Sequence, residues 1–154
     1  MINRELIRIK IVQLTYAYYQ NGHKNMSHAE KELMFSLSKA YDLYNMLLLL
    51  IVAINKEMRK KLEVLTNRAE REGTTPPSFK FVDNRFALQL EENHMLMAFK
   101  ESNKLSWDDD VEFVRKLMNT IEQSDLYREY MANEEDNYDV DRELWRKIYR
   151  TLIQ

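Results

Sequence analysis

Residues 1–20, MINRELIRIKIVQLTYAYYQ, decide how the amino-terminal part of the chain folds. Large apolar residues recur there at helical spacing and form two stripes on different sides of one helix. The members are Ile7, Ile11, Leu14 and Tyr18 on one side, and Ile9, Val12, Tyr16 and Tyr19 on the other. Asn3 is a suitable N-cap, and Asn21-Gly22 is a suitable stop. A helix that is apolar on two sides is usually covered by other helices, so we expect this one to belong to a bundle.

The scarcity of helix-breaking residues predicts an all-α fold. The 154 residues include only two glycines and two prolines, and these residue types are the main interrupters of helices. Residues 73–78, Gly-Thr-Thr-Pro-Pro-Ser, hold both prolines and form the clearest break. We therefore expect an N-terminal three-helix bundle over residues 1–75, followed by a second small helical subdomain over residues 82–154.

Two interpretations of the segment after the first helix stay open. Residues 27–30, Ser-His-Ala-Glu, fit a capping box and predict a helix that starts there. A largely apolar run over residues 41–54 leads into an amphipathic stretch over residues 56–72. A bend near Ser38 or Lys39 would give the two separate helices that a three-helix bundle needs. Because no glycine or proline marks such a bend, one helix of about 45 residues is the alternative.

Capping residues and apolar spacing predict further helices in the second part. These cover residues 84–100, 107–123, 125–131 and 141–154. Asp83 or Asn84 would cap the first of them, and Ser124 would cap the third. Trp107 and Trp145 are expected to anchor the core rather than to stack on bases.

Residue types and their spacing argue against an enzyme. The chain has no cysteine, which excludes disulfides and thiolate metal sites. Two isolated glycines cannot build a phosphate-binding loop, and no Gly-x-Ser-x-Gly motif occurs. Glu91 and His94 have the spacing of one di-iron ligand pair, but such a site needs two of these motifs. We expect no catalytic residue, no metal and no cofactor.

Two acidic stretches have structural interpretations. Residues 108–110 are three aspartates at an expected helix start, where carboxylates complement the positive end of the helix dipole. Residues 132–140 include Glu134, Glu135, Asp136 and Asp139, and we interpret them as a solvated connector. The alternative for this loop is a site that docks a basic partner or competes with RNA.

Charge and hydropathy predict a soluble cytoplasmic protein whose anionic partners meet its first half. Residues 1–72 carry twelve basic and eight acidic side chains, a net charge of +4, whereas residues 73–154 carry eleven and seventeen, a net charge of −6. No secretory signal is visible. The apolar run Met46–Ile54 spans nine residues, well short of the roughly 20 that cross a bilayer. We therefore expect no membrane contact.

Arg4, Arg8 and Lys10 are the strongest candidates for a binding site. Arg4 and Arg8 share one line of the expected helix, because a spacing of four residues returns to the same face. Cations at a helix N-terminus oppose the helix dipole, a mild cost that points to an external anion. Arginine can bind phosphate or a guanine edge with two hydrogen bonds. Tyr16, Tyr18 or Tyr19 would add stacking on unpaired bases. The competing interpretation is a solvated helix turn without a ligand.

Two clusters of residues within about the first 65 match one known helical pattern. Arg4, Arg8, Val12-Gln13 and Tyr16-Ala17 form the first cluster, and Asp42-Leu43-Tyr44 with the Leu-rich residues 47–52 form the second. In both clusters the chain resembles the NusB transcription antitermination family. The first cluster is similar to the family's first helix and the second cluster to its third helix. The stretches YAYYQNG, EKEL, SLSKAYDLYN, FVDNRF and DRELWRKIY make it more similar still to the longer NusB-like proteins of Bacteroidetes.

The resemblance implies an RNA-binding factor that catalyses no reaction. NusB proteins bind the boxA element of leader RNA together with the ribosomal protein NusE and let the RNA polymerase elongation complex read through terminators. The resemblance implies that Arg4 and Arg8 contact the RNA backbone and that Lys10, Gln13 and Tyr16 are further RNA contacts. Where many members continue the arginine cluster, this chain has Glu-Leu, so the implied basic site is thinner.

The chain departs from the family in its second half. The family's second bundle, with its Asn-Glu helix and Lys-Phe-Val/Ile-Asn-Gly turn, has no counterpart here. We therefore expect the N-terminal half of a longer protein, with residues 82–154 as an insertion. The alternative function is a helical protein-interaction module or homodimer without RNA binding, because the first and third expected helices are unusually apolar.

Overall fold

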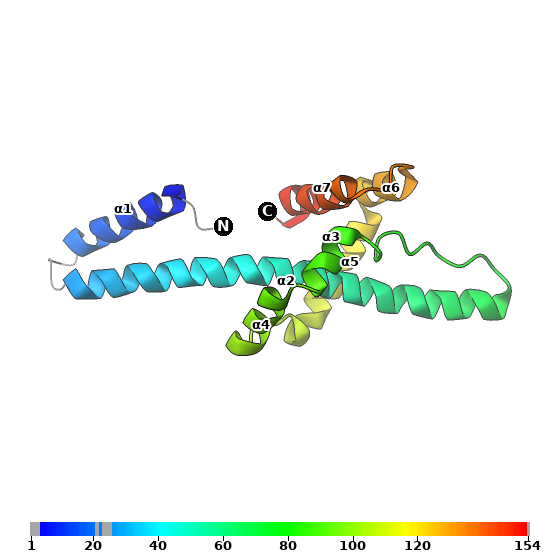
Figure 1. Cartoon of the computed structure of the whole chain (residues 1–154), viewed down its shortest axis with the longest axis horizontal. Helices are drawn as coiled ribbons and strands as arrows, with labels where there is room; N and C mark the ends of the chain where they lie inside the picture. Colours follow the sequence, from blue (N-terminus) through cyan, green and yellow to red (C-terminus); the bar gives the residue numbers. More distant parts are fainter. Residues whose placement is uncertain (1–3, 21, 23–25, 154) are drawn as a thin grey trace. The chain divides into compact units, whose positions relative to one another are not determined.

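The computed structural model describes residues 4–20, Gly22 and 26–153, which form α-helices without any strand (Figure 1). The all-α prediction is therefore confirmed for the described part of the chain. The helices are α1 (Arg4–Gln20), α2 (Met26–Glu72), α3 (Arg85–Glu91), α4 (His94–Asn103), α5 (Val111–Gln123), α6 (Asp125–Ala132) and α7 (Tyr138–Ile148). A 3₁₀ turn (Asp108–Asp110) precedes α5, and a π-helical turn (Tyr149–Ile153) follows α7. The chain divides into two compact units, Met1–Leu47 and Leu48–Gln154.

The first helix, α1, ends where the sequence predicts. Gly22 has a φ of +74°, a left-handed backbone conformation that glycine adopts without a steric cost. Its amide donates a hydrogen bond of 3.3 Å to the Tyr19 carbonyl, which closes the last turn. The predicted cap Asn3 and the predicted stop residue Asn21 lie outside the described residues.

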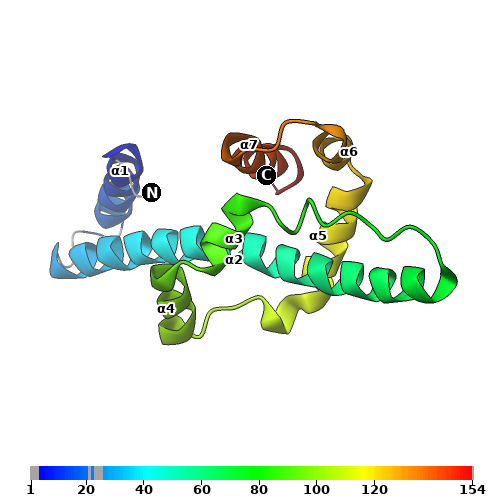
Figure 2. The ribbon, with the colours of Figure 1, turned by 45° about the vertical axis from the view of Figure 1, so that its right-hand side comes forward.

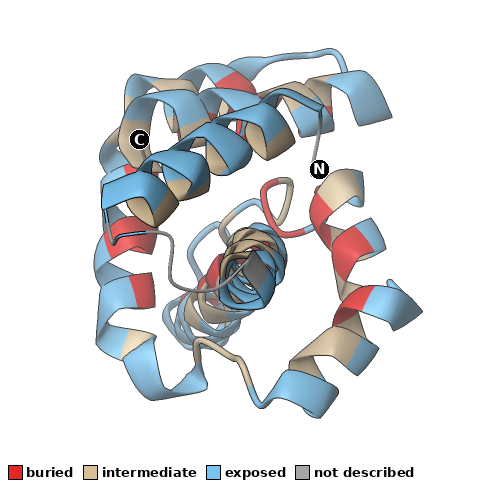
Figure 3. Cartoon of the chain, turned by 90° about the vertical axis from the view of Figure 1, so that its left-hand side faces the viewer, coloured by how far each residue is buried: buried red, intermediate tan, exposed pale blue. Residues whose placement is uncertain are grey.

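Only one side of α1 is partly covered. The helix has no buried residue (Figure 3). Its half-buried residues fall within a sector of about 120° around the helix axis. They are Leu6, Ile7, Lys10, Leu14, Ala17 and Tyr18. The second predicted apolar stripe, which includes Val12 and Tyr16, is exposed. The expected cover on two sides is therefore not found, because this unit holds only α1 and the first part of α2.

Helix α2 runs without interruption over 47 residues. The single-helix alternative is therefore confirmed, and the predicted bend near Ser38 is wrong. Ser38 lies inside the helix, where its hydroxyl donates to the Phe35 carbonyl at 2.8 Å. The part of α2 in the first unit exposes several large side chains, including Met34, Phe35 and Leu43. The first unit thus carries exposed apolar residues on both of its helices.

The core of the second unit forms around the other half of α2. Leu49, Leu50, Ile51, Val52, Ile54 and Asn55 are all buried. Consecutive residues point in all directions around a helix axis, so their burial requires packing against other elements on every side. Helices α3 to α7 provide them, as the end-on view shows most clearly (Figures 2 and 3). Residues 49–62 of α2 are therefore the central core segment, whereas most of residues 63–72 are exposed.

The segment predicted to separate two subdomains belongs to this core. The predicted boundary falls within the second unit. Phe81 and Val82 are fully buried there. The Val82 carbonyl accepts hydrogen bonds from Asn55 Nδ2 at 3.1 Å and from Arg59 Nη2 at 2.8 Å, both on α2. Residues 79–83 turn back on α2.

The helix predicted over residues 84–100 is two helices. Asn84 caps α3, as predicted, and its side chain accepts a hydrogen bond of 3.0 Å from the Ala87 amide. Asn93 then caps α4 by accepting from the Leu96 amide at 3.0 Å. A side chain that satisfies a free helical amide in this way favours a new helix start.

The last three helices lie close to their predicted positions. Buried residues of α5 are Val114, Leu117, Met118 and Ile121, as the apolar spacing predicts. Ser124 caps α6 through the Tyr127 amide at 3.3 Å. Helix α7 begins before the predicted Asp141, because Asn137 accepts from the Val140 amide at 3.0 Å.

The two tryptophans have different environments. Trp145 is fully buried and packs against Phe81, with ring centroids 5.5 Å apart. It is the core anchor that the sequence predicts. Trp107 is only half-buried and stacks on Phe113, with centroids 5.7 Å apart. Phe113 itself is half exposed, so this second pair lies at the surface of the unit.

Candidate nucleic-acid interface

Arg4 and Arg8 lie on the exposed side of α1. One turn separates them, and helical geometry places them within about 40° of each other around the axis. Both are exposed. Among the residues that the structure describes, neither guanidinium has an ion pair or a side-chain hydrogen bond. The pair is therefore free to bind an anion, although Glu5 in the same turn lowers the local positive charge.

Lys10 is separated from this pair. It is half-buried and lies about 160° from Arg8 around the helix axis, so it belongs to the opposite, partly covered side. The predicted group of three cations is thus a pair on one side and a single lysine on the other. A long lysine chain can still extend its ammonium to solvent, but not toward the same ligand face as Arg8.

Gln13 and Tyr16 are both exposed, but only Tyr16 lies near the edge of the arginine face. Tyr16 lies about 80° and Gln13 about 140° from Arg8 around the helix. The Tyr16 side chain is 67% exposed, and its hydroxyl accepts a hydrogen bond of 3.0 Å from Gln20 Nε2. This hydrogen bond restricts the motion of the Tyr16 ring by holding its hydroxyl. An exposed ring held in this way can stack on an unpaired base.

Tyr19 is nearer to the arginine line than Tyr16. It lies about 20° from Arg8 around the axis and about three turns further along the helix. It is 63% exposed, and the neighbouring Tyr18 ring packs edge-on against it at 6.0 Å. Sequence spacing indicates Tyr19 as a stacking candidate, and its exposure supports that role as strongly as it does for Tyr16.

A buried polar cluster in the second unit has no counterpart in the sequence-based site. The Tyr130 hydroxyl donates to Asp141 Oδ1 at 2.6 Å, and the Arg85 amide donates to Asp141 Oδ2 at 2.9 Å. Asn84 Nδ2 donates to the Asp141 carbonyl at 3.1 Å. Arg85 also forms an ion pair of 2.8 Å with Asp136. These bonds join the start of α3 to α6 and α7.

The polar groups of this cluster bond to one another. Burial and the hydrogen bond to Asp141 raise the pKa of the Tyr130 hydroxyl far above its ordinary value, so it stays protonated. A small cavity of about 370 Å³ adjoins the cluster. Every charged side chain around that cavity has a partner, including Lys80, which donates to the Asn133 carbonyl. No group is left to act on a ligand.

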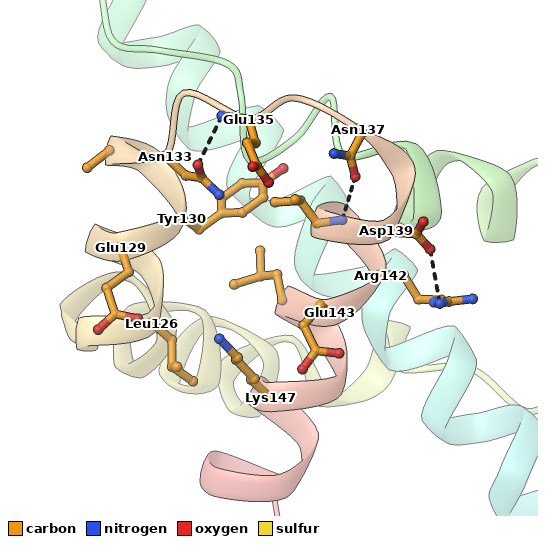
Figure 4. A pocket seen from close by; sticks show the side chains of 13 residues that line it. Leu126, Glu129, Tyr130, Asn133, Glu135, Asn137, Asp139, Arg142, Glu143 and Lys147 are labelled. Carbon is orange, nitrogen blue, oxygen red and sulfur yellow. Dashed lines mark hydrogen bonds and ion pairs between the residues drawn. The ribbon is translucent and has the colours of Figure 1, made fainter.

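A larger groove lies along α6 and α7 (Figure 4). Its volume is about 960 Å³. Leu126, Tyr130, Val140 and Leu144 contribute apolar surface, whereas several carboxylates and two cations surround it. The acidic residues come partly from the loop predicted to be a connector, so this groove bears on the alternative interpretation of that loop.

The other chemical candidates do not form sites. Within the described ranges, no group of three or more histidine and carboxylate side chains is arranged to hold a metal. Glu91 ends α3 and His94 begins α4, so they do not share one helix face. Asp108 pairs with Lys100 at 3.0 Å, and hydrogen bonds from Lys100 and then Ser106 lower the pKa of its carboxyl.

One described helix is long and apolar enough to cross a membrane by length and composition alone. It covers residues 27–72, and a third of its most apolar window is buried inside the protein. The buried part includes Leu49 and Leu50, which pack in the core of the second unit. A core helix passes the same test of length and composition.

Comparisons with family models, curated proteins and solved structures give no match to this chain.

Proposed function

We propose that the chain is a non-enzymatic RNA-binding module of transcription antitermination. The observation that carries the proposal is the pair Arg4 and Arg8, exposed on one side of α1 without a described partner. This pair lies in the segment that resembles the first helix of NusB proteins. By that resemblance, the ligand is boxA-type leader RNA, bound with NusE in the cytoplasmic RNA polymerase elongation complex.

The chemistry of the α1 face suits single-stranded RNA. Two guanidinium groups one turn apart can each bind a phosphate with two hydrogen bonds. Tyr16 and Tyr19 expose rings on which splayed bases can stack, which is how most sequence-specific RNA recognition works. Lys10 and Gln13 lie farther round the helix and have secondary roles in this proposal.

Fluorescence anisotropy tests this proposal directly. A labelled boxA-like single strand and a scrambled strand of the same composition are titrated with the full chain at two salt concentrations. We expect tighter binding to the boxA-like strand than to the scrambled strand. Binding should weaken at higher salt, because the arginine side chains displace counterions from the RNA phosphates.

The double variant Arg4→Ala/Arg8→Ala assigns the contacts. Loss of two phosphate contacts should reduce the slope of log affinity against log salt by about 1.4, since each contact to a single strand contributes about 0.7. Alanine preserves the helix, which circular dichroism can verify. Binding that is unchanged in both strength and salt slope would contradict the assignment of these arginines.

A second candidate function is a helical protein-interaction module that forms a homodimer. It is favoured by the exposed apolar side chains of the first unit, among them Val12, Phe35 and Leu43. Large exposed apolar areas on a protein usually mark an interaction surface. Light scattering over a range of concentrations tests it: a growing dimer fraction that Val12→Asp abolishes would support the candidate, and a strictly monomeric protein would exclude the homodimer.

A further inference from the structure

The groove between α6 and α7 has an apolar floor built from two helix faces. Leu126 and Tyr130 are four residues apart on α6, and Val140 and Leu144 are four residues apart on α7. Each pair therefore lies on one side of its helix. Tyr130 and Leu144 are almost fully buried, whereas Leu126 and Val140 are half exposed. Apolar surface is thus accessible to a ligand within the groove.

Carboxylates on three different elements lie around this floor. Glu129 lies on α6, Glu135 in the connecting loop and Glu143 on α7 (Figure 4). Glu143 is held by Arg146 through two hydrogen bonds of 2.7 and 2.8 Å. For Glu129 and Glu135, no side-chain ion pair or hydrogen bond exists among the described residues. These two carboxylates are available to an external cation.

The cations of the groove do not neutralise it. Arg142 is paired with Asp139 at 3.0 Å. Lys147 lies one turn beyond Glu143 and is the remaining cation of the lining (Figure 4). With Arg146 included, because it pairs with Glu143, four carboxylates face three cations and the groove keeps a net charge of −1. Such a surface repels phosphate groups and attracts basic ligands, so it is a poor site for RNA.

We propose that this groove binds a basic, amphipathic peptide segment of a partner protein. Apolar side chains of the segment would cover Leu126 and Val140, and its lysine or arginine side chains would pair with Glu129 and Glu135. The volume of about 960 Å³ is at the upper end of the range for small-molecule pockets, enough for several side chains. A metal ion fits poorly, because these carboxylates come from three different elements rather than converging on one point.

The acidic loop gains a role in this proposal. Its Glu135 amide is fixed by the Asn133 side chain at 2.9 Å, which orients the loop beside the groove. The Lys80 ammonium donates to the Asn133 carbonyl and lies 5.1 Å from the Tyr130 ring centroid. The loop carboxylate is therefore presented from a tethered backbone. A tethered group loses less conformational freedom on binding than one on a free loop.

Peptide binding to the full chain tests the proposal. The probe is a fluorescein-labelled peptide of Leu-Lys-Lys-Leu repeats, compared with a Gly-Lys-Lys-Gly peptide and a Leu-Glu-Glu-Leu peptide. We expect binding of the first alone, with affinity that falls as salt is raised. The double variant Glu129→Gln/Glu135→Gln should weaken binding about three- to tenfold, as the loss of two exposed charge pairs predicts. Lys147→Gln should strengthen it.

A matched control separates this site from general charge effects. Glu63→Gln/Glu112→Gln removes two exposed carboxylates elsewhere in the same unit and should leave peptide affinity unchanged. Arg4→Ala/Arg8→Ala should also leave it unchanged, so the peptide site and the proposed RNA site can fail independently.

Three results would overturn the proposal: no binding of the Leu-Lys peptide, equal binding of the Gly-Lys peptide, or equal weakening by the groove and control variants. RNA binding, measured without the peptide, that survives Arg4→Ala/Arg8→Ala and is lost in Lys147→Gln would instead identify the groove as a nucleic-acid site and would also overturn the proposal.

Discussion

Tyr130 and Asp141 form a buried hydrogen bond of 2.6 Å between α6 and α7. Their side chains are almost completely enclosed. The second carboxylate oxygen of Asp141 accepts from the Arg85 amide at the start of α3. Both oxygens of the buried carboxylate are therefore satisfied, as a buried charge requires. One side chain thus connects the consecutive helices α6 and α7 to α3, which lies much earlier in the sequence.

Removing the tyrosine hydroxyl should destabilise the protein. In Tyr130→Phe, Asp141 Oδ1 loses its partner in a buried position, and we expect the free energy of unfolding to fall by about 1–3 kcal/mol. Urea denaturation followed by circular dichroism measures this. Tyr127→Phe is the matched control, because Tyr127 lies on the same helix and packs against Phe81 through its ring. Equal losses in both variants would show that the hydrogen bond contributes nothing specific.

Stability should decline in alkaline solution. Burial raises the pKa values of Tyr130 and Tyr149 far above the value of about 10 of an unfolded chain. The folded protein then keeps phenol protons that the unfolded chain loses. The stabilisation is fully present below pH about 10 and is lost as the pH rises from there toward the native pKa values.

The two tyrosines can be tested separately. Urea midpoints measured between neutral pH and about pH 11 should fall more steeply for the unmodified protein than for Tyr130→Phe or Tyr149→Phe, because each variant lacks one linked proton. Lysines that also titrate in this range affect all three proteins alike. Identical slopes in the unmodified protein and both variants would refute the linkage to these residues.

The two asparagine caps should differ in importance. Asn84 caps α3 and also donates to the Asp141 carbonyl at 3.1 Å from a fully buried position, whereas Asn93 is exposed and caps α4 alone. We expect Asn93→Ala to cost about 1 kcal/mol, the usual value of a cap, and Asn84→Ala to cost about 2–4 kcal/mol. Chemical denaturation compares the two. A larger loss for Asn93→Ala would contradict this description of the core.

The two sides of α1 should differ in RNA binding. Arg8→Ala should weaken binding of a boxA-like strand about three- to tenfold at low salt, because it removes one phosphate contact. Lys10→Ala should change affinity less than about twofold, because Lys10 lies on the opposite, partly covered side. Anisotropy titrations at matched salt compare them. A stronger effect at Lys10 would place the RNA on the other face of the helix.

Local signals in the sequence predict much of the helical structure. Ser124 and Asn84 cap helices as expected, and the apolar spacing of α5 identifies its buried residues. The sequence does not reveal the break between α3 and α4, because Asn93 lies in an apolar pattern that continues on both sides of it. Nothing in that pattern indicates that the Asn93 side chain bonds to the Leu96 amide.

Features that depend on distant residues could not be predicted. Asp141 looks like an ordinary acidic residue in the first turn of a helix, which the dipole favours. Its burial depends on Tyr130 and Arg85, which other helices bring together. The spacing of apolar residues also predicts two apolar sides for α1. It does not show whether another helix packs against them. The RNA contacts remain predictions, supported at Arg4 and Arg8 by their exposure.

The exposed loop after α2 is followed by residues that pack back onto α2. These contacts should hold the two segments together even when the loop is cut. Residues 73–76 are exposed, whereas Val82 is hydrogen-bonded to two side chains of α2 and Phe81 is packed in the core. A protease that cuts this loop would nick the second unit without releasing either piece. We therefore expect the α2 segment and the segment from residue 79 onward to reassemble by fragment complementation when they are produced apart.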